Sequence, residues 1–451
     1  MGLYQTSDRQ RFLSAKEEKQ AFPAFRRDYA RVIHSASFRR LQGKTQIFPY
    51  LESDFFRNRL THSLEVAQVA KAIALRINEN HDIHLDYDLV ETAALCHDIG
   101  HPPFGHNGEQ ALWRKMSPYG GFEGNAQTLR LLTRTEKRAY AGQHPIEQGQ
   151  DTRCGLNLTY RALAAVLKYD QPIAVDSHQP DRIVKGYYVS ETKQVEAIKS
   201  HVLNGYSPAA YANKPFYTIE CSIMDLADDI AYSTYDIEDA LKGGFLTPMS
   251  MISADDALLK QVKNQAEKKG FDISLDEIRQ IIRTIFSDMI DLNSTPDHIY
   301  QQSKALAGSS YWRTQLTSKL VNDCIQSVTL QFDRACPVLS TVCLTQAMQK
   351  QVEVLKLLVY FAVINAPKMN IVRYRGREIL STLFDILIES TPETNFLPED
   401  IGQVFYAYQP EDQQQRARVI CDFIASMTDR YAIELYQRFK SDTPQSIFKP
   451  V

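Results

Sequence analysis

The residues best suited to chemistry lie in the segment from Ala93 to His101, where an apolar run ends in the adjacent pair His97 and Asp98. Gly100 and two prolines follow the pair and end any regular helix. Imidazole and carboxylate groups that turn toward one point suit mid-row divalent metal ions. A lone His-Asp pair is common by chance, so the metal prediction depends on its surroundings.

Further histidines gather around this pair, because six of the eleven in the chain fall between residues 62 and 106. His62 stands at the start of a strongly periodic apolar stretch. His101 and His106 follow the apolar run in a turn rich in glycine and proline, where a buried imidazole needs a polar partner. His81 and His84 lie in a polar loop, and we expect them at the surface.

A second acidic group lies in the apolar segment from Met224 to Tyr232, which carries three carboxylates. Asp228, Tyr232 and Asp236 are spaced by four residues, so they share one face of a helix, with Asp225 one turn earlier. A solvated acidic face is the alternative interpretation. The apolar neighbours argue against full exposure, and buried acids need a cation or hydrogen-bond donors.

The elements that must position these groups are mainly helical, because apolar residues recur at steps of three and four. The sequence predicts an all-α fold with minor short β elements. We expect helices over residues 60–77, 89–96, 219–241 and 351–364, short strands over 45–48 and 183–189, and long loops over 133–157 and 170–182.

Composition excludes several classes of protein. The net charge of −3, with 44% hydrophobic and 23% charged residues, is typical of a soluble globular protein and gives no sign of a nucleic-acid or membrane binder. The seven cysteines form no Cys-x-x-Cys motif, and the start of the chain is polar, so we expect reduced thiols and a cytoplasmic location. Neither the phosphate-loop nor the dinucleotide-binding glycine motif is present.

Taken together, the motifs resemble the deoxyguanosine triphosphate triphosphohydrolase family of HD-domain enzymes. The resemblance runs, in order along the chain, through Phe38–Pro49, Arg59–Glu65, His97–Glu109, Gly121–Gln127, Asp225–Asp239 and Met427–Ala432. It implies hydrolysis of a deoxynucleoside triphosphate to the deoxynucleoside and inorganic triphosphate. It also implies an HD-domain helical core over residues 1–245, and additional C-terminal helices over 246–451 that complete the substrate pocket and form oligomer contacts.

The resemblance implies that the metal ligands are His62, His97, Asp98 and Asp228, with Asp225 as the fallback for the last. Two histidines and two carboxylates leave positions open for water and a phosphate oxygen. Such a mixed nitrogen and oxygen set suits one divalent ion per site, Mn²⁺, Mg²⁺ or Fe²⁺.

By the same similarity, His106 is the catalytic histidine, and Glu109, one helical turn later, can orient its ring. The sequence leaves open whether His106 acts as acid, base or nucleophile. His101 is expected to support the metal ligands or to contact phosphate. Arg59 and Lys168 are the expected phosphate-binding cations. Lys185 is a weaker candidate and is interpreted as ordinary loop charge.

Substrate selection also follows from the resemblance. Tyr232 is expected to pack against C2′ of the sugar and to exclude a 2′-hydroxyl, while Gln46 and Asp236 hold the 3′-hydroxyl. Gln42 is an alternative to Gln46, and Asn125 matches another substrate-contacting position. Guanine recognition has only general candidates, the arginines at positions 373, 375, 377, 416, 418 and 430.

Two other functions remain open at this stage. One is an HD phosphohydrolase acting on a phosphomonoester, a cyclic nucleotide or a guanosine polyphosphate. The other is a nucleotide-sensing or single-stranded-DNA-binding protein in which catalysis is secondary. The resemblance also implies a homo-oligomer, a hexamer or a tetramer, with single-stranded DNA or a nucleotide as effector and no membrane partner.

Overall fold

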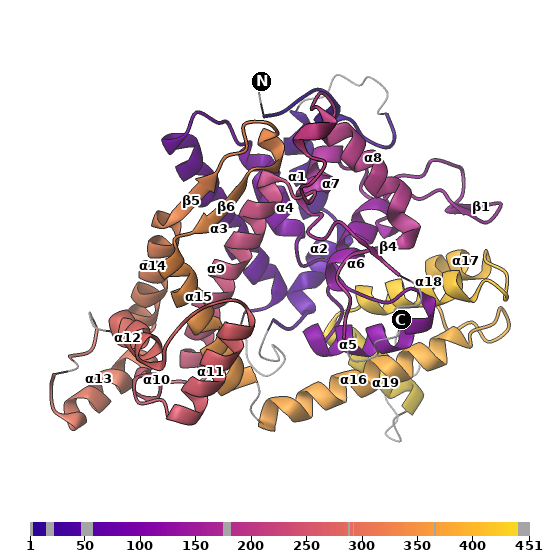
Figure 1. The fold of residues 1–451 in the computed structure, drawn as a ribbon. Helices are drawn as coiled ribbons and strands as arrows, with labels where there is room; N and C mark the ends of the chain where they lie inside the picture. The colour runs from indigo at the N-terminus through magenta and orange to yellow at the C-terminus, as the bar shows by residue number, and fades with distance from the viewer. Residues whose placement is uncertain are drawn as a thin grey trace. The chain divides into compact units, whose positions relative to one another are not determined.

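The structure is a computed structural model that describes residues 3–14, 22–46, 57–174, 182–286, 289–291, 293–364 and 367–440, with only the backbone at 364 and 367–369. Within these residues the fold is helical with a few short strands (Figure 1), which confirms the all-α prediction. The chain forms two compact units. The larger unit is Met1–Asp225, Phe332–Thr341 and Arg373–Val451, and the smaller unit is Leu226–Gln331 and Val342–Val372.

The larger unit holds most of the motifs. Its helices are α1 (Ala24–Ile33), α2 (Ala36–Arg40), α3 (Arg59–Asn80), α4 (Tyr87–Cys96), α5 (Gly105–Met116), α6 (Gly124–Arg130), α7 (Tyr160–Ala165), α8 (Thr192–Val202), α17 (Glu399–Tyr406), α18 (Gln413–Ser426) and α19 (Asp429–Lys440). Two helices, α9 (Ile219–Lys242) and α16 (Pro367–Ile388), have residues in both units. The predicted domain boundary at residue 245 stays a prediction.

The smaller unit is a set of helices with one strand pair. Its helices are α10 (Pro248–Ile252), α11 (Asp256–Lys268), α12 (Leu275–Phe286), α13 (Pro296–Gly308), α14 (Ser310–Gln326) and α15 (Gln346–Val359). Strand β5 (Val328–Gln331) pairs with β6 (Thr341–Leu344). Helix α11 packs against α12 and α15, and α13 packs against α10 and α14.

Helices α3 and α4 pack along each other and carry the first motif residues at their ends. Helix α3 begins with a capping box, in which the side chain of Asn58 accepts from Thr61 and the Thr61 hydroxyl accepts from Asn58. Asp86 caps α4 by accepting from the Leu89 amide at 3.2 Å. Because both caps fix where the helices start, the predicted helices over 60–77 and 89–96 are confirmed.

The strands are shorter than the sequence predicts. Of the expected strand over 183–189 only β4 (Tyr187–Tyr188) forms, paired in parallel with β3 (Pro172–Ile173). The chain turns into a 3-10 helix at Val189, which ends the pairing. In the expected strand over 45–48, Thr45 makes an isolated bridge to Asn58, and positions 47 and 48 lie outside the described residues. The loop over 133–157 contains the hairpin of β1 (Ile146–Glu147) and β2 (Gln150–Asp151).

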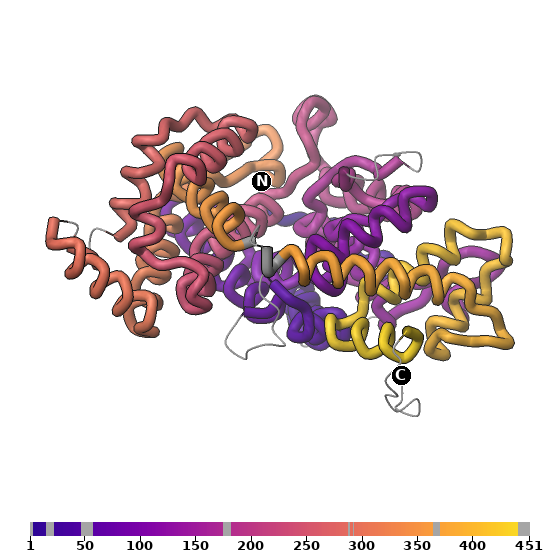
Figure 2. The backbone as a smooth tube through the Cα atoms, turned by 90° about the horizontal axis from the view of Figure 1, so that it is seen from below, coloured from indigo at the N-terminus to yellow at the C-terminus, as the bar shows by residue number. Residues whose placement is uncertain are grey.

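The C-terminal helices form one hydrophobic core with α5. The buried side chains come from α5, the second half of α16, and α17 to α19, and include Leu112, Leu380, Leu383, Phe405 and Ile420. Figure 2 shows the yellow C-terminal helices beside the indigo early part of the same unit. Helix α18, near the end of the described residues, therefore contacts the early segment around Lys44 directly.

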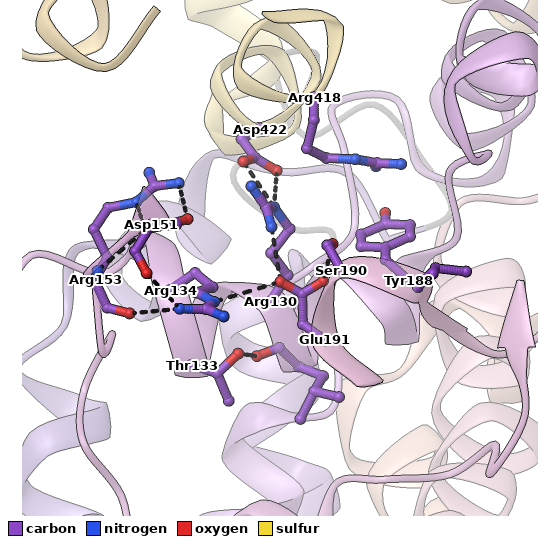
Figure 3. A network of polar contacts seen from close by, with 12 residues as sticks. Arg130, Thr133, Arg134, Asp151, Arg153, Tyr188, Ser190, Glu191, Arg418 and Asp422 are labelled. Carbon is purple, nitrogen blue, oxygen red and sulfur yellow. Dashed lines mark hydrogen bonds and ion pairs between the residues drawn. The ribbon is translucent and has the colours of Figure 1, made fainter. Parts of the chain in front are cut away.

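A buried network of charges fastens α6 to α18 (Figure 3). Arg130 donates from Nε to both carboxylate oxygens of Asp422 at 2.9 Å, and from Nη1 to Glu191 at 2.8 Å. The guanidinium of Arg418 lies 3.7 Å from the ring centroid of Tyr188. Because buried charges are tolerated only when they are paired, this network fixes how the two helices meet.

Candidate active site

His62, His97 and Asp98 form the one group of metal-ligating side chains found among the described residues. One ligand atom from each lies within 4.8 Å of the others, and all three residues are buried. His62 is in the first turn of α3, whereas His97 and Asp98 directly follow α4, so the antiparallel packing of these helices brings them together. The rings of His62 and His97 meet edge to face, with centroids 5.4 Å apart.

The contacts of His97 prepare it for a metal ion. Its Nδ1 atom lies 2.6 Å from the carbonyl oxygen of Ala94, to which it donates its proton. The lone pair of the neutral ring is therefore on Nε2, the atom that faces Asp98 at 3.6 Å. A backbone carbonyl that fixes the ring tautomer is the usual support of a metal-binding histidine. The donor set thus fits a divalent ion.

The two carboxylate oxygens of Asp98 contact two different side chains, Arg59 and His101. Arg59 donates from Nη1 to Oδ2 at 2.6 Å, and His101 places Nδ1 2.9 Å from Oδ1. Burial acts to raise the pKa of Asp98, but Arg59, His101 and His97 outweigh it and hold the pKa well below its usual range. Asp98 therefore offers an anionic oxygen that could ligate a cation.

His106 and Glu109 form a pair at the beginning of α5. His106 Nδ1 lies 3.0 Å from Glu109 Oε2, and the histidine side chain is 72% exposed while that of Glu109 is 2% exposed. The Gly124 amide donates to the other carboxylate oxygen at 2.9 Å. Burial acts to raise the pKa of Glu109, but His106 and Lys185 lower it below its usual value. The anion orients the ring, so that Nε2 points away from it.

The loop between α4 and α5 brings this pair close to His101, which contacts Asp98. The rings of His101 and His106 lie 5.9 Å apart between centroids. Phe104 and Gly105 both have left-handed backbone, with φ of 61° and 57°, and this turn starts α5. Non-glycine residues rarely adopt that conformation, so the turn at Phe104 needs support from its surroundings.

Glu123 connects Asn125 and Lys185 to the site. Its carboxylate caps α6 through the Ala126 amide at 2.8 Å and accepts from Asn125 Nδ2 at 2.7 Å. Lys185 Nζ lies 2.8 Å from Glu123 and 3.9 Å from Glu109. Sequence reasoning interpreted Lys185 as loop charge. The structure instead places it beside the His106–Glu109 pair, a placement for which no local pattern in the sequence gives a signal.

Lys168 lies next to this cluster, on the chain that follows α7. It forms an ion pair with Asp225, which also accepts from the Tyr217 hydroxyl at 2.9 Å. The amines of Lys168 and Lys185 lie 5.8 Å and 5.9 Å from the ring centroid of Tyr169. Asp225, the fallback ligand, is therefore held by Lys168 and Tyr217 and is not part of the metal-ligating group.

The remaining predicted residues lie in several places. Gln46 is half-buried, and its Oε1 atom is buried without a hydrogen-bond partner among the described residues. Asp228, Tyr232 and Asp236 lie on α9, in the residues assigned to the smaller unit, and their spacing puts them on one face of that helix. Asp236 is buried, and their roles as ligand and sugar contacts stay predictions.

A buried set of two imidazoles and a carboxylate, beside an exposed histidine oriented by a buried glutamate, can hold a divalent ion and move a proton next to it. Helices that carry a His and a following His-Asp pair define the class of HD-domain phosphohydrolases. The HD domain family matches residues 59–148, and the phosphohydrolase-associated domain matches residues 342–438.

The chain belongs to the family of deoxyguanosinetriphosphate triphosphohydrolase-like proteins. It is 45% identical to deoxyguanosinetriphosphate triphosphohydrolase-like protein 2 of Mesorhizobium japonicum, with 100% of both chains covered. It is 33% identical to the deoxyguanosinetriphosphate triphosphohydrolase-like protein of Pasteurella multocida, with 95% of this chain and 97% of that one covered. The relative from Shewanella sediminis is 34% identical, with 92% and 91% covered. None of the helices described has both the length and the apolar character that a membrane crossing requires.

Proposed function

We propose that this protein hydrolyses deoxynucleoside triphosphates, with dGTP preferred, to the deoxynucleoside and inorganic triphosphate. Water adds a hydroxyl to the α-phosphorus, the bond from that phosphorus to O5′ of the sugar breaks, and O5′ takes a proton. The observation that carries the proposal is the buried group of His62, His97 and Asp98 lying one histidine ring, that of His101, from the exposed His106–Glu109 pair.

His62, His97 and Asp98 would hold the divalent ion, with Asp228 as the fourth ligand by family resemblance. When bound, Mn²⁺, Mg²⁺ or Fe²⁺ supplies Lewis-acid stabilisation of the charge on the phosphate oxygens. Arg59 holds Asp98 in its anionic form and adds positive charge at the same point. The protein therefore gathers cations where a triphosphate needs them.

His106 is proposed to move the proton. Because Glu109 accepts from Nδ1, the Nε2 atom of His106 is the one that exchanges a proton with water or substrate. The exposure of the histidine allows a substrate to reach it, whereas burial of Glu109 keeps the ring in one orientation. Acid, base and nucleophile roles all use this same Nε2 atom.

Lys168 and Lys185 are proposed to bind the triphosphate beyond the α-phosphate. Both amines lie against Tyr169, and Lys185 is within 3.9 Å of Glu109, so two cationic side chains lie together near the His106–Glu109 pair. Asn125, held by Glu123, supplies an amide. His101 lies between the metal ligands and His106 and can contact phosphate from there.

Selection of the sugar is proposed to use Tyr232 against C2′, with Gln46 and Asp236 at the 3′-hydroxyl. The support is the family resemblance, the helical spacing of Tyr232 and Asp236 on α9, and the buried Oε1 atom of Gln46. A site that hydrogen-bonds a hydroxyl discriminates strongly against an analogue that lacks it. The family resemblance also supports a cytoplasmic homo-oligomer, a hexamer or a tetramer, with single-stranded DNA or a nucleotide as effector.

The test is product analysis with purified protein, each of the four dNTPs and GTP, in the presence of Mn²⁺ or Mg²⁺. We expect equal amounts of deoxynucleoside and intact triphosphate on anion-exchange chromatography, with dGTP turned over fastest. His106→Ala should lose this activity, and exposed His84→Ala is the matched control that should keep it. Release of orthophosphate or pyrophosphate, or equal turnover of GTP, would count against the proposal.

A further inference from the structure

The loop from His97 to Gly105 carries most of the proposed chemistry but has little regular structure of its own. It contains two metal ligands and His101, and it ends where α5 presents His106. At Phe104 and Gly105 the backbone is left-handed, a conformation that costs free energy at a non-glycine residue. Contacts from elsewhere in the fold must therefore hold this loop in its shape.

Two buried side chains from other segments provide those contacts. Lys44 Nζ donates to the carbonyl oxygen of His101 at 2.6 Å and to that of Ala425 at 2.8 Å. Asp429 accepts from the Phe104 amide at 3.0 Å through one carboxylate oxygen. It accepts from the Thr45 amide at 3.0 Å and the Thr45 hydroxyl through the other. We call Lys44, Thr45 and Asp429 the clamp.

Packing around the clamp leaves little room for movement. A side-chain carbon added at Gly43 would lie 2.6 Å from the Thr428 methyl group, and one added at Gly376 would lie 2.9 Å from Phe104. Lys44 and Asp429 are 1% and 2% exposed. Lys44 and Asp429 contact the loop through its backbone, at the carbonyl oxygen of His101 and the amide of Phe104.

We infer that Asp429, acting with Lys44 and Thr45, is a positioning residue for the reaction, because it fixes the loop that sets His101 and His106 against the metal ligands. The inference rests on the proposed function of that site. It assigns the segment after α18 a part in catalysis through its contact with the loop. Removing the acceptor of the Phe104 amide should let the turn relax and separate His106 from the ligands.

The experiment compares Asp429→Asn and Asp429→Ala with the wild-type protein and with Asp385→Asn, an exposed carboxylate in the same unit that pairs with Lys115. Asparagine keeps one acceptor oxygen, and alanine keeps none, so kcat should fall in that order. A misplacement of about 1 Å can cost roughly 100-fold in rate, and we expect a loss of that size for alanine. Metal content should stay at the wild-type level, and KM should change less than kcat.

Amide hydrogen exchange distinguishes positioning from general destabilisation. The peptide covering residues 97–106 should lose protection in Asp429→Ala, while the peptide covering 62–77 of α3 keeps it. Wild-type kcat and unchanged exchange in a folded Asp429→Ala would overturn the inference, and if that variant does not fold, Asp429→Asn is judged by the same criteria. Inactive wild-type protein would refute the proposed function instead, and the exchange measurement would still decide the role of Asp429.

Discussion

Each carboxylate oxygen of Asp98 has its own partners in the site. One oxygen faces Arg59, and the other faces His101 and His97. The carboxylate is therefore a candidate metal ligand and also the ion-pair partner that holds Arg59 in the site. His97 is equally constrained, since its contact with the Ala94 carbonyl determines which ring nitrogen carries the lone pair.

Asp98→Ala should abolish dNTP hydrolysis and reduce bound metal, because it removes one ligand and leaves Arg59 without its carboxylate partner. The loss in metal affinity should be at least about 100-fold, the upper range for losing even a supporting contact. Metal analysis of the purified protein and kcat/KM for dGTP measure both effects. Asp82→Ala, at an exposed carboxylate, is the control. Full activity with full metal content in Asp98→Ala would refute the metal assignment.

Residue type and position at a helix end carry enough information to predict that His62, His97 and Asp98 lie together, while their role as metal ligands and that of Asp228 stay predictions. His62, His97 and Asp98 lie together as expected, and His106 does pair with Glu109 one turn later. Lys185 could not be predicted, because its place beside Glu123 depends on how a loop returns across α6 rather than on any local spacing.

At the scale of elements, α6 packs in close backbone contact with the loop after α4. A side-chain carbon added at Gly100 would lie 2.2 Å from the Thr128 amide nitrogen and 2.3 Å from the Gly124 carbonyl oxygen. Both are backbone atoms, so neither can move aside without moving the helix. The Gly124 amide also binds Glu109, which ties the position of α6 to the orientation of His106.

Gly100→Ala should therefore destabilise the protein and impair catalysis together. Overpacking a tight contact costs about 1–3 kcal/mol, and the displaced α6 would no longer hold Glu109 in place. Gly308→Ala is the matched control, because nothing lies within 4 Å of an added carbon there. Thermal unfolding and kcat for dGTP measure the two effects. If Gly100→Ala matches Gly308→Ala in both, α6 does not position the catalytic pair.

Helical elements could be predicted where apolar residues recur with helical spacing, as in α3, α4, α9 and α15. The resemblance implies helices over 246–451, but the bounds of the helices between residues 248 and 326 and of those after 367 could not be predicted, since their apolar patterns are mixed with polar residues. The length of the expected strand over 183–189 was overestimated, because only two of its residues form a strand. A pairing as short as Ile173 with Tyr188 has no alternating pattern to detect and depends on the fold that brings the two segments together.

At the scale of the whole molecule, Lys44 links the stability of the fold to pH. Burial, with Arg59 adding to it and Asp429 opposing it, lowers the pKa of Lys44 from 10.5 to about 7. Between these values the unfolded chain binds a proton that the folded chain does not bind. The free energy of unfolding contributed by this group therefore increases as pH rises from about 7 toward 10.5.

Lys44→Met removes this group and should remove its pH dependence. The difference in unfolding free energy between the wild-type protein and Lys44→Met should grow in favour of the wild type as pH rises from 7 to 9. The gradient should be at most about 1.4 kcal/mol per pH unit. Urea unfolding of both proteins at several pH values measures it. A difference that is constant or shrinks over this range would contradict the burial effect on Lys44.

The contacts of the clamp also constrain how the protein can be made. Thr45 and Asp429 are 384 residues apart, and Lys44 and Ala425 are 381 apart. A growing chain on the ribosome exposes the metal-ligating residues long before the segment that holds their loop has been synthesised. Contacts of such high sequence separation form late in folding. Nascent chains should thus stay catalytically silent until residue 429 has emerged and the clamp has formed around the loop.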